Sequence, residues 1–136
     1  MVNLFLGPTH DLSFLYNDEE AMRVTPQEIA TFIMQDEIVA VYNGRSEAGP
    51  RALGNRSILY DPRDINTKDT INKVKKRERF RPFAAAVLKD YANQWFDMSG
   101  LNRSPTMSYA VQTIEDKKEL IPGVVHIDGT CRVQTV

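Results

Sequence analysis

Residues 44–63 contain four arginines interleaved with three glycines, and this run limits the possible folds more than any other part of the chain. Four guanidinium groups are costly to bury without partners, so the run has to lie at a surface or line a polar site. Glycine lets a backbone approach a ligand closely. Arginine presents a planar set of donors that suits phosphate and carboxylate oxygens. The run therefore predicts an anion-binding loop that carries Arg45, Arg51, Arg56 and Arg63.

A second basic cluster follows directly and ends at Pro82-Phe83. Residues 45–81 carry eleven Lys or Arg against five Asp or Glu, a local balance of +6, whereas the whole chain carries −1. Such a charge separation draws anions to one region. The near-neutral total and the pI of about 6.1 argue against general nucleic-acid binding.

Length and composition predict one soluble domain. The chain has 136 residues, 42% of them hydrophobic, and no apolar run approaches the ~20 residues of a membrane span. The N-terminus lacks the basic start of a signal peptide, and Cys131 is the single cysteine, so we expect a cytoplasmic protein without disulfides. Two histidines and one cysteine, widely spaced, predict no metal site.

The pattern of elements predicts an α/β fold. We expect a lead-in over residues 1–20, with a turn at Gly7-Pro8, and a domain over residues 21–136. Residues 25–28, TPQE, form a capping box that starts a helix. Further helices are expected over 66–76 and 91–96, and strands over 38–42 (buried), 57–60, 83–88, 107–113, 124–127 and 132–136. The last strand reaches the final residue, which predicts a C-terminally truncated domain with an open edge and self-association as a homodimer.

Each motif has a structural alternative beside its functional interpretation. Residues 44–55 form either an anion cradle of backbone amides and arginines, or a polar loop whose arginines pair with acids such as Glu47, Asp61 and Asp64. In the cradle, Glu47 would hold an arginine or contact a ribose hydroxyl. Residues 75–83 form either a second wall of that site, with the cations at 75, 77, 79 and 81 on one side of an extended segment, or a solvated helix end. Phe80 and Phe83 favour the wall, because we expect both rings to pin the segment to a core.

The third cluster lies at residues 126–132. His126 and Asp128 would share one face of a strand, and His126 could exchange a proton near neutral pH. Alternatively, Asp128-Gly129 forms a hairpin turn beside a histidine whose hydrogen bonds are satisfied, and the residues alone do not decide between the two. Cys131 is expected to be an inert core thiol.

With these clusters identified, the chain resembles the C-terminal domain of the O-carbamoyltransferases, the family of NodU-type nodulation proteins and of antibiotic carbamoyltransferases such as the tobramycin enzyme. The matching motifs are GRSEAGPRALGNRSIL at 44–59, KKRERFRPFA at 75–84 and HIDGTCRVQTV at 126–136. The resemblance covers almost the whole chain. It implies a YrdC-like fold, a twisted open mixed sheet with flanking helices around a basic cavity. Ala85 and Gly123 depart from the proline and alanine that the family usually has there.

The resemblance also implies a chemistry. The domain would bind ATP, with Mg²⁺, and carbamoyl phosphate, and join carbamate to AMP as carbamoyl-adenylate. A separate N-terminal transferase domain would pass the carbamoyl group to the hydroxyl of a small-molecule acceptor. Since that domain and the family's final segment are absent, we expect this fragment to be inactive alone. One alternative is a YrdC-like module that binds RNA or tRNA without transferase activity. Another is a degenerate regulatory or scaffolding domain that keeps the pocket but not the activity.

The resemblance assigns the site residues as follows. Those expected to act on carbamoyl phosphate, carbamate and the leaving groups are Arg45, Arg51, Arg56, His126 and Arg132. Those expected to bind the nucleotide are Lys75, Arg77, Arg81, Ser57, Asn55 and Glu47.

Overall fold

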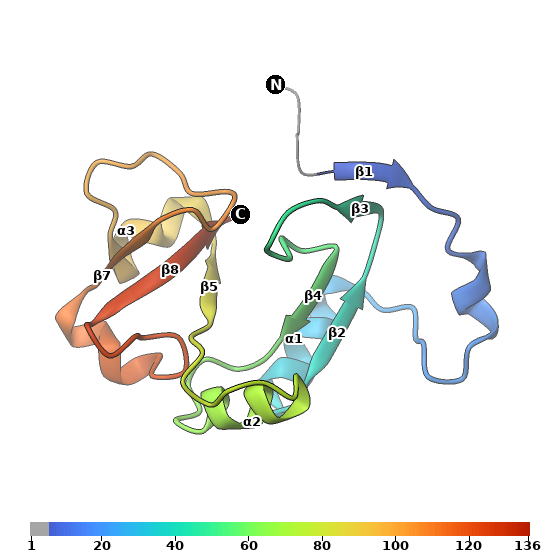
Figure 1. Ribbon diagram of the computed structural model, residues 1–136, viewed down its shortest axis with the longest axis horizontal. Coiled ribbons are helices and arrows are strands. Elements are labelled where there is room, and N and C mark those ends of the chain that lie inside the picture. The colour runs from blue at the N-terminus through green and yellow to red at the C-terminus, as the bar shows by residue number, and fades with distance from the viewer. Residues whose placement is uncertain (1–5) are drawn as a thin grey trace. The chain divides into compact units, whose positions relative to one another are not determined.

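The computed structural model describes residues 6–136 (Figure 1). The chain divides into two compact units, the first ending at Tyr60 and the second beginning at Asp61. The first unit contains two antiparallel strand pairs and a helix. The second contains a four-stranded sheet with helices. The α/β class with open sheets is confirmed. No helix in the described residues is long and apolar enough to cross a membrane.

The first unit starts with a strand where we expected an irregular lead-in. Strand β1 (Leu6–Thr9) pairs antiparallel with β3 (Arg45–Glu47), and a 3-10 helix follows at Ser13–Asn17. The prediction of a turn at Gly7-Pro8 is therefore wrong. Proline is tolerated because β1 is paired on one edge only and its register is irregular between Leu6 and Thr9.

Helix α1 (Pro26–Met34) begins at the predicted capping box. The Thr25 hydroxyl accepts from the Glu28 amide, and the Glu28 carboxylate accepts from the Thr25 amide. Strand β2 (Val39–Tyr42) pairs antiparallel with β4 (Arg56–Leu59). The expectation of a buried strand at 38–42 is wrong, because Ala40 and Tyr42 are exposed.

The second unit is built on a mixed sheet in the order β5-β8-β7-β6. Strand β5 (Ala84–Val87) runs parallel to β8 (Thr130–Thr135), and β8 runs antiparallel to β7 (Ala110–Thr113). Strand β6 (Phe96–Asp97) forms the other edge. The remaining elements are α2 (Thr67–Val74), α3 (Ala92–Trp95) and 3-10 helices at Lys89–Tyr91 and Glu115–Leu120.

The last strand lies inside the sheet rather than at its edge. β8 has β5 on one side and β7 on the other, and the Val136 amide still donates to the carbonyl of Val87. The prediction that this strand lacks a neighbour is therefore wrong. The expected homodimer loses its basis and stays a prediction.

The core of the second unit lies between this sheet and its connections. Cys131 and Val133 are two residues apart on β8, so they share one face of the sheet, and both are fully buried. Burial raises the pKa of the Cys131 thiol to about 11, so the thiol stays protonated at neutral pH, as expected for an inert core cysteine. The buried apolar residues are Ala92, Phe96, Met98, Val111, Ile121, Val124, Cys131 and Val133.

Residues 124–127 form turns, and the strand predicted there is wrong. The Val124 amide donates to the carbonyl of Ile121, and the Gly129 amide donates to that of His126. The apolar pair Val124-Val125 resembles a strand in sequence, but Val124 belongs to the core and Val125 packs against it from a turn.

Gly123 is needed because the chain passes very close to the start of α2. Its amide donates to the carbonyl of Pro62 at 2.9 Å. A Cβ at this position would lie 2.7 Å from Cβ and Oγ1 of Thr67 and 2.9 Å from the Pro62 oxygen. Thr67 cannot yield easily, because its hydroxyl is bonded to the carbonyls of Asp61 and Asp64.

We therefore expect Gly123→Ala to lower the free energy of unfolding by about 2 kcal/mol, as overpacking a buried contact does. Urea denaturation followed by circular dichroism measures the change. Glu119→Ala, at an exposed position in the preceding 3-10 helix, is the control and should stay near the wild type. If Gly123→Ala were as stable as the control, the close approach of residue 123 to Thr67 and Pro62 would be contradicted.

Candidate functional site

The side chain of Asn72 holds the second basic cluster together. It is fully buried on α2, and its Nδ2 donates to the carbonyls of Arg79 and Arg81, both at 3.0 Å. Its Oδ1 accepts from Nε of Arg77 at 2.5 Å. Sequence reasoning missed this residue. The available signal was a short amide next to Ile71 on the inner face of an amphipathic helix.

Arg77 is the most fixed cation of this cluster. Besides its bond to Asn72, its guanidinium lies 4.6 Å from the centre of the Phe83 ring. Burial, and secondly the charge of Arg81, lower the pKa of Arg77. No carboxylate of the described residues forms an ion pair with Arg77, so its remaining N–H groups are available to an anion.

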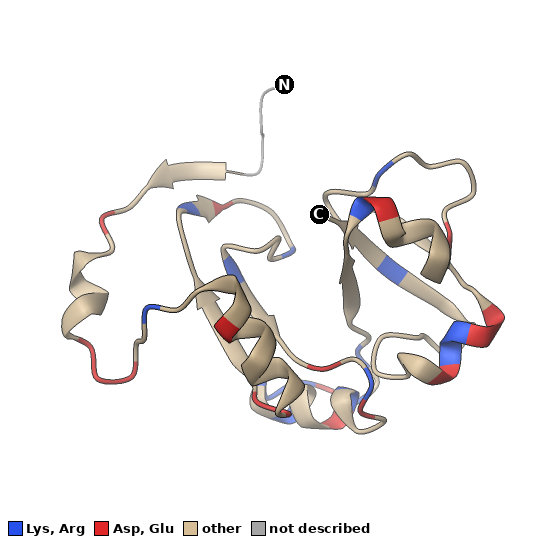
Figure 2. Cartoon of the chain, turned by 180° about the vertical axis from the view of Figure 1, so that it is seen from behind, with Lys and Arg blue, Asp and Glu red and all other residues tan. Residues whose placement is uncertain are grey.

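The segment after α2 turns back on itself instead of extending. The Arg81 amide donates to the carbonyl of Glu78, and their side chains form an ion pair at 2.6 Å. Arg79 forms a two-point ion pair with Asp69. Acidic residues thus lie among the basic ones along α2 and this segment (Figure 2). The expectation that the cations at 75, 77, 79 and 81 share one side of an extended segment is wrong.

The two phenylalanines of the segment differ. Phe83 packs against the core as expected, whereas Phe80 is 83% exposed and does not pin the chain. Lys75, at the C-cap of α2, is exposed and forms no ion pair with any described residue. Lys75 and Arg77 therefore remain as the cations of the predicted nucleotide set that no carboxylate of the described residues neutralises.

In the first unit, the carboxylate of Glu47 fills the glycine-rich loop. It accepts from the amides of Leu53 at 2.8 Å, Asn55 at 3.2 Å and Arg56 at 3.0 Å. A cluster of backbone amides of this kind is an anion site, and here the anion belongs to the chain itself. The loop brings backbone amides together, but Glu47 occupies these three, and the predicted cradle for a ligand anion stays a prediction.

Arg45 and Arg56 are tied to backbone carbonyls. Arg45 donates through Nε to Gly7 at 2.7 Å and through Nη2 to Leu6 at 3.1 Å, which joins β3 to β1. Arg56 donates to the carbonyl of Asn43 at 2.5 Å and lies 3.7 Å from the centre of the Tyr42 ring. Both guanidinium groups keep further N–H donors. Their predicted role toward carbamoyl phosphate stays a prediction.

The remaining polar residues of the loop also stabilise it. Asn55 Nδ2 donates to the carbonyl of Arg45 at 2.9 Å, and the buried Ser57 hydroxyl accepts from the amide of Gly54 at 2.9 Å. Arg51 is different. Its Nε is buried and has no hydrogen-bond partner among the described residues. Arg63, by contrast, is paired with Asp61 in the second unit, as the polar-loop alternative expected, and this pair lowers the pKa of Asp61.

His126 lies in a turn and uses both ring nitrogens. Nε2 is 3.1 Å from the carbonyl of Phe83, and Nδ1 is 3.1 Å from the hydroxyl of Thr130. Asp128 accepts from the Thr130 hydroxyl and amide, which lower the pKa of this carboxyl. The shared strand face that we expected for His126 and Asp128 is wrong. The arrangement is that of the hairpin turn with a satisfied histidine, and proton exchange by His126 stays a prediction.

Arg132 lies on β8 between Cys131 and Val133, which are both fully buried. Because side chains alternate along a strand, it stands on the opposite face of the sheet from Cys131 and Val133. The structure thus gathers Lys75, Arg77 and Arg81 in one segment after α2. The loop residues gather around Glu47 in the first unit. In the described residues, no three His, Cys, Asp or Glu side chains lie together as a metal site.

Comparison with known proteins identifies the family. Residues 30–136 match the family described as carbamoyltransferase C-terminus. The chain belongs to this family of transferase domains. It is 49% identical over 109 residues to nodulation protein NolNO of Sinorhizobium fredii, which covers 79% of this chain and 16% of that protein.

Two further relatives extend the match. Nodulation protein NolO of Bradyrhizobium diazoefficiens is 45% identical over 109 residues, which is 79% of this chain and 20% of that protein. Nodulation protein U of the same organism is 36% identical over 134 residues, which is 98% of this chain and 23% of that protein. The chain thus spans about a fifth of the length of these curated relatives, as expected for part of a longer enzyme.

Because Asn72 alone satisfies two carbonyls of the basic segment, we expect Asn72→Ala to lower the free energy of unfolding by about 3 kcal/mol. Chemical denaturation measures this loss. The exposed Asn93→Ala, on α3, is the matched control and should change stability by less than about 0.5 kcal/mol. If both variants unfold at the same denaturant concentration, the amide of Asn72 does not organise the segment.

Removal of the Glu47 carboxylate should open the glycine-rich loop. In Glu47→Ala, the amides of residues 53, 55 and 56 lose their acceptor, so we expect their hydrogen exchange to quicken about tenfold or more. Exchange measured by NMR tests this. Glu37→Ala, an exposed glutamate outside the loop, should leave those three rates unchanged. Unaltered protection in Glu47→Ala would overturn the assignment of the carboxylate as the loop's anion.

Proposed function

We propose that the chain is the carbamoyl-adenylate-forming module of an O-carbamoyltransferase. The observation that supports it most is the match of residues 30–136 to the carbamoyltransferase C-terminus family. The substrates would be carbamoyl phosphate and ATP, the latter with Mg²⁺. The acceptor would be a hydroxyl of a small molecule, presented by a separate N-terminal transferase domain of the full-length enzyme.

The proposed reaction runs in three balanced steps. Water cleaves carbamoyl phosphate to carbamate and phosphate. A carbamate oxygen then attacks the α-phosphorus of ATP, forming carbamoyl-adenylate while pyrophosphate leaves. Finally the acceptor hydroxyl attacks the carbamoyl carbon, loses its proton, and AMP leaves. Every step gathers negative charge on phosphoryl oxygens, which fixed cations stabilise.

The cations left without carboxylate partners support this assignment. Lys75 and Arg77 are the members of the nucleotide set best able to bind ATP phosphates, because Arg81 already shares its charge with Glu78. Arg51 is the loop arginine whose buried Nε still lacks an acceptor, which fits a role toward carbamoyl phosphate. Arg45 and Arg56 would contribute their remaining donors, while Asn55, Ser57 and Glu47 would shape the loop. His126 and Arg132 would lie near the carbamate.

Calorimetric titration of the chain with Mg-ATP tests the nucleotide site. We expect Lys75→Ala and Arg77→Ala each to weaken binding about tenfold, since a hydrogen bond to a charged group contributes roughly 1.5–3 kcal/mol. Lys75 is exposed, so its variant separates binding from folding, which Arg77 also supports. Lys89→Ala, an exposed lysine on the 3-10 helix after β5, is the control.

Two results would contradict the proposal. Equal Mg-ATP affinity in wild type and Lys75→Ala would remove Lys75 from the nucleotide site. A folded chain that fails to bind Mg-ATP but retains tRNA in a salt-dependent manner would instead favour the RNA-binding alternative, to which the exposed Phe80 ring among cations would be suited.

A further inference from the structure

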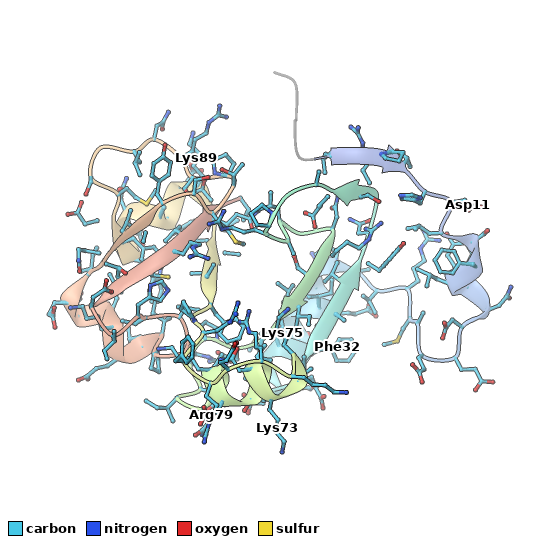
Figure 3. The ribbon with its side chains drawn as sticks, in the orientation of Figure 1. Asp11, Phe32, Lys73, Lys75, Arg79 and Lys89 are labelled. Carbon is cyan, nitrogen blue, oxygen red and sulfur yellow. The ribbon has the colours of Figure 1, made fainter. Side chains whose placement is uncertain are left out.

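An open surface cavity of about 440 Å³ lies against α2, and its lining overlaps only in part with the motif at residues 75–84. Its volume falls in the range of small-molecule sites. Lys73 and Arg79 point away from α2 on the same side of the helix, and Lys75 lies on the other side in this view (Figure 3). The lining residues are Asp69, Thr70, Lys73, Arg77 and Arg79.

The charge of this lining is positive, with three cations and one carboxylate. Asp69 and Arg79 neutralise each other through a two-point ion pair that also fixes both side chains. Lys73 is exposed and forms no ion pair with any described residue. The excess positive charge of the cavity therefore rests on Lys73 and Arg77.

The geometry of the donors suits a phosphate group. Thr70 and Lys73 are three residues apart on α2, so their side chains lie on one face of the helix. Arg77 is held in place by Asn72 and Phe83, which leaves its Nη groups as pre-set donors. An ammonium, a hydroxyl and a guanidinium line the cavity, and donors of these kinds match the acceptor oxygens of a phosphate monoester.

Asp69, four residues before Lys73 on the same face of α2, supplies acceptors. Both oxygens of Asp69 are engaged by Arg79, yet each carboxylate oxygen has a second lone pair. The Asp69 side chain is 51% exposed, so a ligand hydroxyl can reach it. A ligand that carries a phosphate and hydroxyl groups could therefore use both the cations and this carboxylate.

We propose that this cavity is a second anion site, which binds the phosphate ester of a small hydroxyl-bearing molecule. Lys73 and Thr70 are its distinguishing residues, and neither belongs to the motifs of the proposed nucleotide site. The site goes beyond the proposed function, since it does not require Lys75, Arg81 or the glycine-rich loop.

The test is an NMR titration of the chain with ribose 5-phosphate, with ribose as the matched compound without phosphate. We expect ribose 5-phosphate to shift the amide signals of residues 69–79, and ribose to leave them unchanged. Lys73→Ala and Thr70→Val should each weaken this binding, the former about tenfold. Lys75→Ala, on the other side of α2, should bind ribose 5-phosphate as the wild type does.

Three outcomes would overturn the site. The first is equal shifts with ribose and ribose 5-phosphate, and the second is unchanged affinity in Lys73→Ala. The third is a loss in Lys75→Ala as large as that in Lys73→Ala, which would assign the phosphate to the nucleotide site. Failure of the proposed function is separate, because it appears as unaltered Mg-ATP affinity in Lys75→Ala.

Discussion

The buried amide of Asn72 is the contact on which the second unit's chemistry depends. A side chain with two donors and an acceptor satisfies the carbonyls of Arg79 and Arg81 and fixes Nε of Arg77. Without it, a segment of six charged residues in seven, from Lys75 to Arg81, would have like charges close together and few apolar contacts to hold it. The hydrogen bonds of Asn72 set the direction of each cation in the segment. Arg79 and Arg81 consequently form ion pairs with acidic side chains, whereas Arg77 does not.

In the glycine-rich loop, by contrast, the side chain that holds the backbone together is an acid. Glu47 accepts three backbone amides, and Arg45 and Arg56 donate to carbonyls, so most of the loop's polar groups stabilise the loop itself. A count of arginines therefore overstates the charge available to a ligand. Arg51, with its buried and unpartnered Nε, is the loop arginine of the described residues whose position the internal bonds do not account for. An anion that reached it would complete its hydrogen bonding.

The sequence predicted correctly those elements that depend on interactions between residues close together in the chain. The capping box at Thr25, the helix after Asn66 and the alanine-rich strand at β5 all formed as expected. The failures involve partners distant in sequence. Strand β1 exists because it meets β3 almost forty residues later, and β8 is interior because β5 and β7 both pair with it. Val124 and Val125 are apolar because they pack in and against the core from a turn, not because they belong to a sheet, and Ile127 is fully exposed. The motif residues were found, but Asn72 was not. Its place beside Ile71 was the available signal, but the carbonyls that its amide binds belong to residues 79 and 81, beyond the helix.

Arg77 connects the two proposed anion sites, because it belongs to the predicted nucleotide set and also lines the α2 cavity. Its guanidinium has five N–H donors, and Asn72 occupies the one on Nε. The four on the Nη atoms remain, and a phosphate takes two of them in a bidentate contact. One arginine therefore has enough donors for an anion on either side of α2, provided that its plane stays fixed. Asn72 and the Phe83 ring supply that fixation.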